Sequence, residues 1–131
     1  MSSPICKRSM PHYGVYVRLG ASTLHGVGVF AVRAIKKGTN PFRHDNSTMV
    51  WVEEKKLRRL PGGIRKLYED FGVLKNGHYG VPPNFNQLTP AWYINNSTNP
   101  NMRCGKDYDF FAVRDIEPGE ELTIDYSTYS E

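Results

Sequence analysis

The residues of segment 92–102, WYINNSTNPNM, are the first candidates for chemistry in this sequence. Four asparagines in eleven positions bring many amide donors and acceptors next to an aromatic pair. Such a segment could be an exposed loop, a glycosylation site, or a site whose side chains hold a ligand. Asn46, Asn95 and Asn96 have the acceptor spacing for N-glycosylation, with a hydroxyl residue two positions later. No secretory signal is recognisable, so glycosylation is the least favoured of the three.

Other residue types that carry catalysis are present, but their spacing does not favour it. Glu120 and Glu121 resemble a carboxylate pair, yet neighbouring strand residues point to opposite faces, which favours structural contacts. The four histidines show no ligand spacing, and Cys6 and Cys104 make neither a zinc set nor a disulfide framework. The sequence therefore predicts no metal site and two reduced thiols in an intracellular protein.

Composition limits the chain to ordinary globular classes. Its 131 residues fit one domain, and contents of 39% hydrophobic and 23% charged residues argue against disorder. No apolar run is long enough to cross a membrane. The net charge of +4 suits an acidic partner such as nucleic acid or chromatin, without requiring one.

Many short strands must position the candidate residues. Residues 1–12 are expected to form a flexible arm and residues 13–131 a single domain. Two short helices are expected within 53–63 and 64–72, separated at Pro61-Gly62-Gly63, and 76–91 should be loop with one short strand. Alternating and apolar runs predict strands at 13–19, 29–35, 48–52, 108–116 and 121–126. The expected fold class is mostly β.

One stretch of the sequence is echoed later. FAVRAIKKG (30–38) returns as FAVRDIEPG (111–119), with six identical residues at equal offsets. A strand that leads into a glycine turn often has this pattern, and this explanation is favoured over an internal repeat. Both segments are predicted to be half-buried strands that end in a polar turn.

Three segments together resemble the signature segments of the SET-domain protein lysine methyltransferases. They are HGVGVFAVRAIKKG (25–38), WYINNSTNPN (92–101) and VRDIEPGEELTIDY (113–126), in the family's order. The resemblance implies a β fold of several small sheets with short helices. It also implies a C-terminal pseudoknot, in which 92–101 is threaded under a loop of the C-terminal segment. The chain is similar to a minimal SET domain without a cysteine-rich post-SET segment.

The resemblance implies S-adenosylmethionine as cofactor. Glycine permits close approach of the main chain to a ligand, although a Gly-X-Gly alone is more often an ordinary turn. At position 96 the family usually has histidine, and an asparagine there should weaken cofactor binding without abolishing it. The cofactor-binding residues implied are His25, Gly26, Val27, Gly28, Tyr79, Asn95 and Asn96.

Tyr126 matches the family's catalytic tyrosine. Methyl transfer needs a neutral amine, because a lysine ammonium, with a pKa of about 10.4, has no lone pair. An aromatic channel disfavours the charged form, and a phenol oxygen with backbone carbonyls can align the amine. Phe85 and Tyr129 are expected to line the lysine channel. Ile124, two residues before Tyr126, has no hydroxyl, from which the resemblance implies di- or trimethylation.

The function expected is methylation of a lysine in a protein substrate, such as a histone tail or a similar basic tail. Chromatin association, a nuclear location and a homodimer are further expectations. One alternative is a SET-fold module that binds chromatin or protein but transfers methyl groups poorly. Another is a nucleic-acid-binding β domain, for which the basic run is Lys55, Lys56, Arg58 and Arg59. An acidic patch for the basic tail is expected from Asp107, Asp109, Asp115, Glu117, Glu120 and Glu121.

Overall fold

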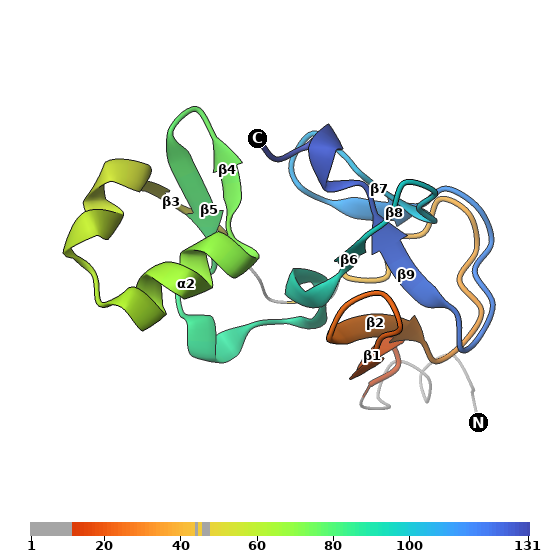
Figure 1. Ribbon diagram of the computed structural model, residues 1–131. Coiled ribbons are helices and arrows are strands. Elements are labelled where there is room, and N and C mark those ends of the chain that lie inside the picture. The colour runs from red at the N-terminus through yellow and green to blue at the C-terminus, as the bar shows by residue number, and fades with distance from the viewer. Residues whose placement is uncertain (1–11, 44, 46–47) are drawn as a thin grey trace, which may run out of the picture.

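The computed structural model describes residues 12–43, 45 and 48–131, so the predicted arm lies almost entirely outside the described residues. Figure 1 shows two lobes, a helical lobe (residues 50–87) and a sheet lobe (residues 13–43 and 90–129). The architecture is mostly β, with several small sheets and few short helices, which confirms the predicted fold class.

A four-stranded sheet forms the centre of the sheet lobe, in the order β1-β2-β9-β6. The middle strand β9 pairs antiparallel with β2, where Val29 faces Leu122, and parallel with β6, where Asn95 faces Thr123. Strand β9 pairs on both edges, and its Leu-Thr-Ile run at 122–124 is buried throughout, with Leu122 and Ile124 in the core cluster. The four strands are β1 (Val17–Ala21), β2 (Val27–Ala31), β6 (Asn95–Asn96) and β9 (Glu121–Ile124).

A two-stranded hairpin, β7 (Met102–Cys104) and β8 (Phe110–Ala112), completes the sheet lobe. Together with the central sheet it encloses the core, in which Val29, Ile116 and Leu122 are fully buried.

The two echoed segments bind each other symmetrically. Ile35 and Ile116 form an antiparallel bridge, with N–H to oxygen distances of 2.9 and 2.8 Å between donor and acceptor. The glycine that ends each echo has a φ near 90°, at 89° and 87°. Each of these glycines donates its N–H to the alanine of the other echo, at 2.8 and 2.7 Å. The likeness in sequence thus extends to the way in which the two segments pair.

The helical lobe contains a three-stranded sheet in the order β3-β5-β4 and one α-helix. Strands β4 and β5 form a hairpin whose turn is Asn76-Gly77, with φ values of 52° and 73°. Positive φ at both turn residues is the preference of a tight hairpin turn. The elements are β3 (Val50–Glu53), the 3₁₀ helix η1 (Glu54–Arg59), α2 (Gly62–Phe71), β4 (Val73–Lys75) and β5 (His78–Val81).

Two further 3₁₀ helices, η2 (Phe85–Gln87) and η3 (Pro90–Tyr93), lead back to the sheet lobe, and η4 (Tyr126–Thr128) follows β9. Each of the five predicted strands overlaps an observed strand, although the observed strands are shorter. The two predicted helices correspond to η1 and α2. Gly62 and Gly63 begin α2 instead of separating the helices, so the chain breaks at Leu60 and Pro61 alone.

Candidate functional site

The segment that follows η3 lies against β9, as the expected crossing of residues 92–101 and 113–126 requires. Asn101, which is 2% exposed, donates from Nδ2 to the Glu121 carbonyl at 2.8 Å. Its Oδ1 accepts from the Thr123 N–H, also at 2.8 Å. The Asn101 side chain therefore pairs with one main-chain carbonyl and one main-chain N–H of β9, and this pairing holds the two segments side by side.

Asn95 links this crossing to the loop before β2. Its Nδ2 lies 3.0 Å from the His25 carbonyl, 3.2 Å from the Val27 carbonyl and 3.0 Å from Glu121 Oε2. The side chain is 6% exposed. The structure thus brings together three of the predicted cofactor residues, but it shows the Asn95 amide nitrogen engaged by the protein's own acceptors.

Glu121 also holds the loop before β2, through Ser22. Its carboxylate accepts from Ser22 Oγ, and Ser22 Oγ accepts in turn from the main-chain N–H groups of Leu24 and His25. A Cβ at Gly28 would collide with this carboxylate, so a glycine is required there by internal packing. Glu121 therefore has the structural role that its position in a strand indicated.

Gly26 differs from Gly28 because it has open space around it. Its φ is 44°, and no atom would lie within 4 Å of a Cβ at this position. The next residue, Val27, is 46% exposed. The main chain of 26–27 is therefore open to approach by a ligand.

Asn96 keeps a side-chain hydrogen bond across the crossing. Its Oδ1 accepts from the Tyr126 N–H at 2.7 Å. An imidazole nitrogen of a neutral histidine could accept this same bond. The amide thus keeps an acceptor for the Tyr126 N–H at the position where the family usually has histidine.

Tyr126 begins η4, directly after β9. Its hydroxyl donates to the Ile94 carbonyl at 2.5 Å, and its ring packs edge-on against that of Tyr129 at 6.3 Å between centroids. Burial raises the pKa of the Tyr126 phenol, so the neutral form is maintained at physiological pH.

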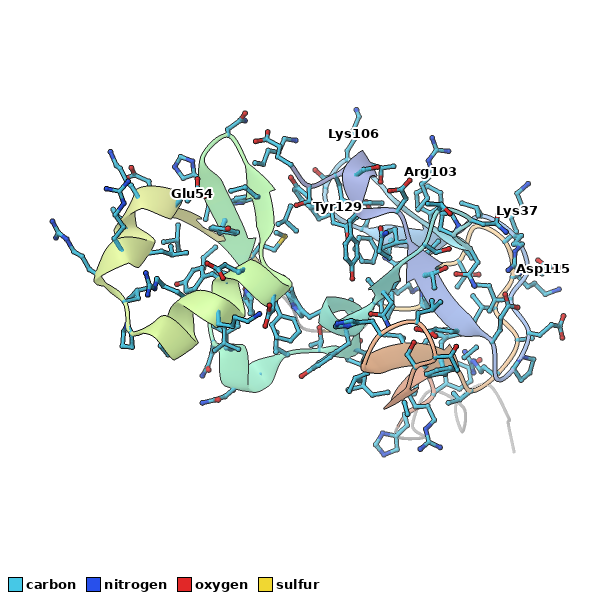
Figure 2. All side chains as sticks on the ribbon, viewed as in Figure 1. Lys37, Glu54, Arg103, Lys106, Asp115 and Tyr129 are labelled. Carbon is cyan, nitrogen blue, oxygen red and sulfur yellow. The ribbon has the colours of Figure 1, made fainter. Side chains whose placement is uncertain are left out.

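A cavity of about 530 Å³ lies between the two lobes. Tyr126, Tyr129 and Ile94 belong to its lining, so the structure places the predicted catalytic and channel tyrosines together. Figure 2 shows Tyr129 pointing toward the region between the lobes. Met49 precedes the helical lobe, which contributes mainly Trp51, Glu69, Asp70, Phe71 and Val73, and the sheet lobe adds Ala91, Trp92, Lys106, Asp107, Tyr108 and Phe110.

Residues 129–131 close one side of this cavity by docking on β4. Ser130 Oγ accepts from the Leu74 N–H at 3.1 Å, and the Glu131 N–H donates to the Leu74 carbonyl at 2.8 Å. The Glu131 carboxylate accepts from the Asn76 N–H at 3.2 Å. Tyr129 itself packs on Phe110 at 5.7 Å, and burial raises the pKa of its phenol. This tail strap, residues 129–131, holds the two lobes together.

Of the predicted site residues, only Tyr126 and Tyr129 line the cavity. The loop before β2, β2 itself and β6 hold His25, Gly26, Val27, Gly28, Asn95 and Asn96, and the last two predicted residues lie in the helical lobe. Tyr79 and Phe85 do not line the cavity; both pack edge-on against Tyr68, at 6.2 and 5.2 Å. Their aromatic side chains pack within the helical lobe, and the cofactor role of Tyr79 and the channel role of Phe85 stay predictions. Ile124 is 1% exposed and also lies outside the cavity lining, so the structure does not support the inference about methylation number.

The acidic side of the cavity comes from residues other than those expected. Glu120 pairs with Arg114, whose guanidinium lowers the pKa of the Glu120 carboxyl, and Asp115 accepts from the Lys37 N–H. These carboxylates are used within the sheet lobe, and Asp107 alone of the predicted patch lines the cavity. Glu69 and Asp70 of α2 supply the other negative charges, although Asp70 pairs with Lys66.

Several cavity residues were not singled out in the sequence. Trp51 is 42% exposed, and its ring lies 5.7 Å from that of Tyr108 in the turn after β7. Tyr108 has a φ of 60°, which is rare for a bulky residue. Phe71 packs against Tyr93 at 5.4 Å. The only sequence feature that could have indicated these cavity residues is that they are large aromatic residues near the ends of predicted elements.

Within the described residues, no group of three or more His, Cys, Asp or Glu could hold a metal ion. Across the same ranges, no helix has the length and apolar character needed to cross a membrane. Cys104 is a free thiol, and burial raises its pKa to about 11. Cys6, the other predicted thiol, lies outside the described residues.

Comparison with solved structures shows a shared fold at low sequence identity. A Plasmodium falciparum protein named as a candidate histone methyltransferase matches with a TM-score of 0.58 and 20% identity, over 86% of this chain and 93% of that chain. A humanized mutant of the Chaetomium thermophilum Polycomb Repressive Complex 2, bound to the inhibitor GSK126, matches with a TM-score of 0.61 and 22% identity. The ctPRC2 structure in an autoinhibited conformation, bound to S-adenosylmethionine, matches with a TM-score of 0.62 and 24% identity.

Both PRC2 matches cover 88% of this chain but only 15% and 16% of the chains matched, so this chain corresponds to a small part of those proteins. The SET domain profile matches residues 26–127, a range that includes Gly26 and β2, the crossing at Asn95 and Asn96, and Tyr126. This chain therefore belongs to the SET-domain family.

Proposed function

We propose that this protein is an S-adenosylmethionine-dependent protein-lysine N-methyltransferase. The observation that carries the proposal is the position of Tyr126, whose hydroxyl is held by the Ile94 carbonyl in the wall of the inter-lobe cavity. Membership of the SET-domain family and the S-adenosylmethionine bound in a structure of similar fold support the same activity.

The residues present fit this cofactor. A cavity of about 530 Å³ is within the size range of small-molecule sites, which are mostly apolar with a few fixed polar groups. None of His25, Gly26, Val27, Gly28, Asn95 and Asn96 lines this cavity, so the polar ends of such a ligand would reach beyond it to the open main chain at Gly26 and Val27. Asn95 would act by holding the loop through the His25 and Val27 carbonyls.

When bound, the cofactor supplies a methyl group on a sulfonium ion. The chain's own residues would select the neutral lysine amine, because aromatic walls disfavour a buried ammonium. The Tyr126 hydroxyl and the Ile94 carbonyl, already in contact, would fix the direction of the amine lone pair. Tyr129 and the tail strap would exclude water from the side of the cavity next to β4.

A basic protein tail, such as a histone tail, is the proposed substrate. Glu69, Asp107 and one cation, Lys106, line the cavity, and none of the three has an ion-pair partner among the described residues, so the two carboxylates outnumber the ammonium group. Their charge would favour a cationic peptide over an acidic one. Chromatin association, a nuclear location and a homodimer remain predictions that belong to this proposal.

A SET-fold binding module with little activity is the second candidate. Asn96 favours it, because an amide replaces the family's usual histidine at the crossing. This candidate predicts that a lysine peptide binds but is not modified.

Calorimetry with S-adenosylmethionine, followed by mass spectrometry of a histone mixture, separates the candidates. We expect cofactor binding and a gain of 14 Da per methyl group, the mass of CH₂, on a lysine of one histone. Cofactor binding or histone binding without modification would support the binding module. Absence of cofactor binding would refute the proposed activity.

A further inference from the structure

The positive charge of this protein is concentrated in one short segment. Residues 54–66 contain six of the 17 basic residues and one of the 13 acidic residues. This segment therefore has a formal charge of +5, whereas the rest of the chain has a charge of −1. The net charge of +4 is thus a property of η1 and the first turn and a half of α2, not of the molecule as a whole.

The basic side chains of this segment face solvent. Leu57 is the single buried residue of η1, so the other residues of this helix point outward. Lys55 and Lys56 share Glu53 as a partner, at 3.2 and 3.7 Å. Within the described residues, no ion-pair partner is present for Arg58, Arg59 or Arg65. The basic face is defined here as Lys55, Lys56, Arg58, Arg59 and Arg65.

Helix stability does not explain this arrangement. The N-terminus of a helix favours acidic residues and the C-terminus favours basic ones. In α2 the order is reversed, because Arg65 and Lys66 follow the N-terminus and Glu69 and Asp70 precede the C-terminus. The first turn has no acidic residue, and Pro61 provides no side-chain cap.

Arg65 adds to the exposed positive end of α2. Its Nη2 lies 3.7 Å from the position that a Cβ on Gly62 would occupy, so the guanidinium folds back over the first turn. The unpaired N–H groups of this turn carry a partial positive charge of their own. The segment therefore places guanidinium groups and helix-end amides on one solvent-facing region.

We propose that the basic face binds the phosphate backbone of duplex nucleic acid without reading its sequence. Guanidinium groups recognise phosphate in a planar, paired geometry. Segment 54–66 contains no aromatic residue, so it has no platform on which unpaired bases could stack. A duplex, whose bases are already stacked, is therefore favoured over a single strand.

The location of the basic face is compatible with simultaneous use of the cavity. Figure 1 shows η1 at the end of the helical lobe that lies away from the sheet lobe. The opposite end of α2 contributes Glu69 and Asp70 to the cavity lining. A duplex bound at the basic face would leave the cavity open to a protein substrate. This binding does not depend on the proposed enzymatic activity.

Fluorescence anisotropy with a labelled duplex of about 20 base pairs tests the proposal, with the affinity measured at several salt concentrations. Each phosphate contact contributes a slope of about −0.9 in a plot of log affinity against log salt, so three arginine contacts contribute about −2.7. We expect Arg58→Gln/Arg59→Gln/Arg65→Gln to reduce the slope by about this amount. The ratio of the affinity at 50 mM salt to the affinity at 200 mM salt would then be about 40-fold smaller in the variant than in the parent.

The matched control removes the same charge from the sheet lobe. Lys36→Gln/Lys37→Gln/Arg103→Gln changes exposed residues of that lobe, where Figure 2 shows Lys37 and Arg103. We expect the control to retain the parent slope, and circular dichroism melting should show that both variants are folded. An equal loss in both variants would mean that net charge alone governs binding, which would overturn the proposal.

Three other outcomes would also overturn the proposal. The parent could fail to bind the duplex at 50 mM salt. A single strand of equal charge could bind more tightly, which would indicate base stacking. Polyglutamate of equal charge could bind as tightly as the duplex, in which case an acidic protein would be the better partner.

Discussion

At the scale of single residues, the chemistry depends on one hydroxyl. Tyr126→Phe removes the group that donates to the Ile94 carbonyl and preserves the ring. We expect turnover of an accepted peptide to fall about a hundredfold, because the amine loses its alignment. The affinity for S-adenosylmethionine should not change, since the loss is confined to the transition state. Single-turnover kinetics and calorimetry measure the two quantities separately.

The loss of this hydroxyl should also lower stability by about 0.5–1.5 kcal/mol, the usual net contribution of one hydrogen bond. Tyr13→Phe is the matched control, because Tyr13 is 54% exposed and lies outside the cavity lining. A Tyr126→Phe protein with the turnover of the parent would show that the catalytic role was assigned to the wrong residue.

The departure at position 96 gives a prediction with a pH dependence. In Asn96→His, a neutral imidazole can accept from the Tyr126 N–H as the amide does, and we expect higher cofactor affinity or turnover above about pH 7. Protonated histidine has no acceptor, so the gain should disappear as pH falls below about 6.5. Reduced activity at every pH would indicate that the site is built around the amide. Turnover measured from pH 6 to 8 decides this.

Burial of Cys104 predicts how stability changes at high pH. Its folded-state pKa is raised from 9.0 to about 11. A raised pKa means that the unfolded chain loses its proton first, so the stabilisation is complete below about pH 9 and is lost as pH rises to about 11. Tyr126 and Tyr129 act in the same direction, because burial also raises the pKa values of their phenols.

We therefore expect the urea midpoint to fall between pH 9 and pH 11. Cys104→Ala should reduce this fall. An identical fall in the variant would mean that the tyrosines or other groups cause the whole effect.

At the scale of elements, the tail strap predicts a link between β4 and the cavity. Ser130→Ala with Glu131→Ala removes the side-chain acceptors for the Leu74 and Asn76 N–H groups. We expect faster hydrogen exchange at these two amides, and a KM for peptide raised about 2- to 10-fold with a smaller change in kcat. Mass spectrometry and steady-state kinetics measure the two effects.

Glu117→Gln is the charge-matched control for this pair, because Glu117 is exposed and its carboxylate makes no contact within the described residues. Unchanged exchange at Leu74 and Asn76 would show that the strap does not hold β4 in solution.

A charge exchange in helix α2 is expected to raise the stability of the protein. Exchanging the charges of the Lys66–Asp70 pair, as Lys66→Asp with Asp70→Lys, keeps an i,i+4 pair but places the acid toward the N-terminus. This order agrees with the helix dipole, so we expect Tm to increase. A lower Tm would mean that the present order is required by packing. Differential scanning calorimetry provides the comparison.

Some elements were predictable and others were not, for local physical reasons. Asn76-Gly77 is a strong hairpin signal, and it lies between β4 and β5, yet only one strand was expected in this region. The three-residue strand β4 is too short to show alternation. Strand β6 has two residues, and its parallel pairing with β9 has no local sequence signal.

The candidate site was predictable only in part. Asn95 and Tyr126 were proposed because each lies in a short segment that resembles a signature of the family, and Tyr129 because it lies three residues after Tyr126; their roles stay predictions. Tyr79 and Phe85 lie outside the cavity lining, and the sequence could not show this because an aromatic residue has the same sequence signature in a core as in a channel.

At the scale of the whole molecule, the cavity exists because two lobes meet. Trp51 and Tyr108 touch although 57 positions separate them, and Phe71 touches Tyr93 across the same boundary. Such contacts depend on how the lobes pack, which single-residue propensities do not determine. The charge division has the same origin, because the acidic end of α2 lies at the boundary and the basic end lies away from it.

The position of β9 in the middle of the central sheet has a consequence for protein synthesis. Strand β2 pairs with β1 early, but it lacks its second neighbour, β9, until residues 121–124 have left the ribosome, about 90 residues after β2 itself. Closing a loop of this size costs chain entropy before any packing compensates for it, so assembly of the sheet lobe should be slow. Until then the apolar side of the β1–β2 hairpin remains uncovered, and the nascent chain is a natural client for chaperones.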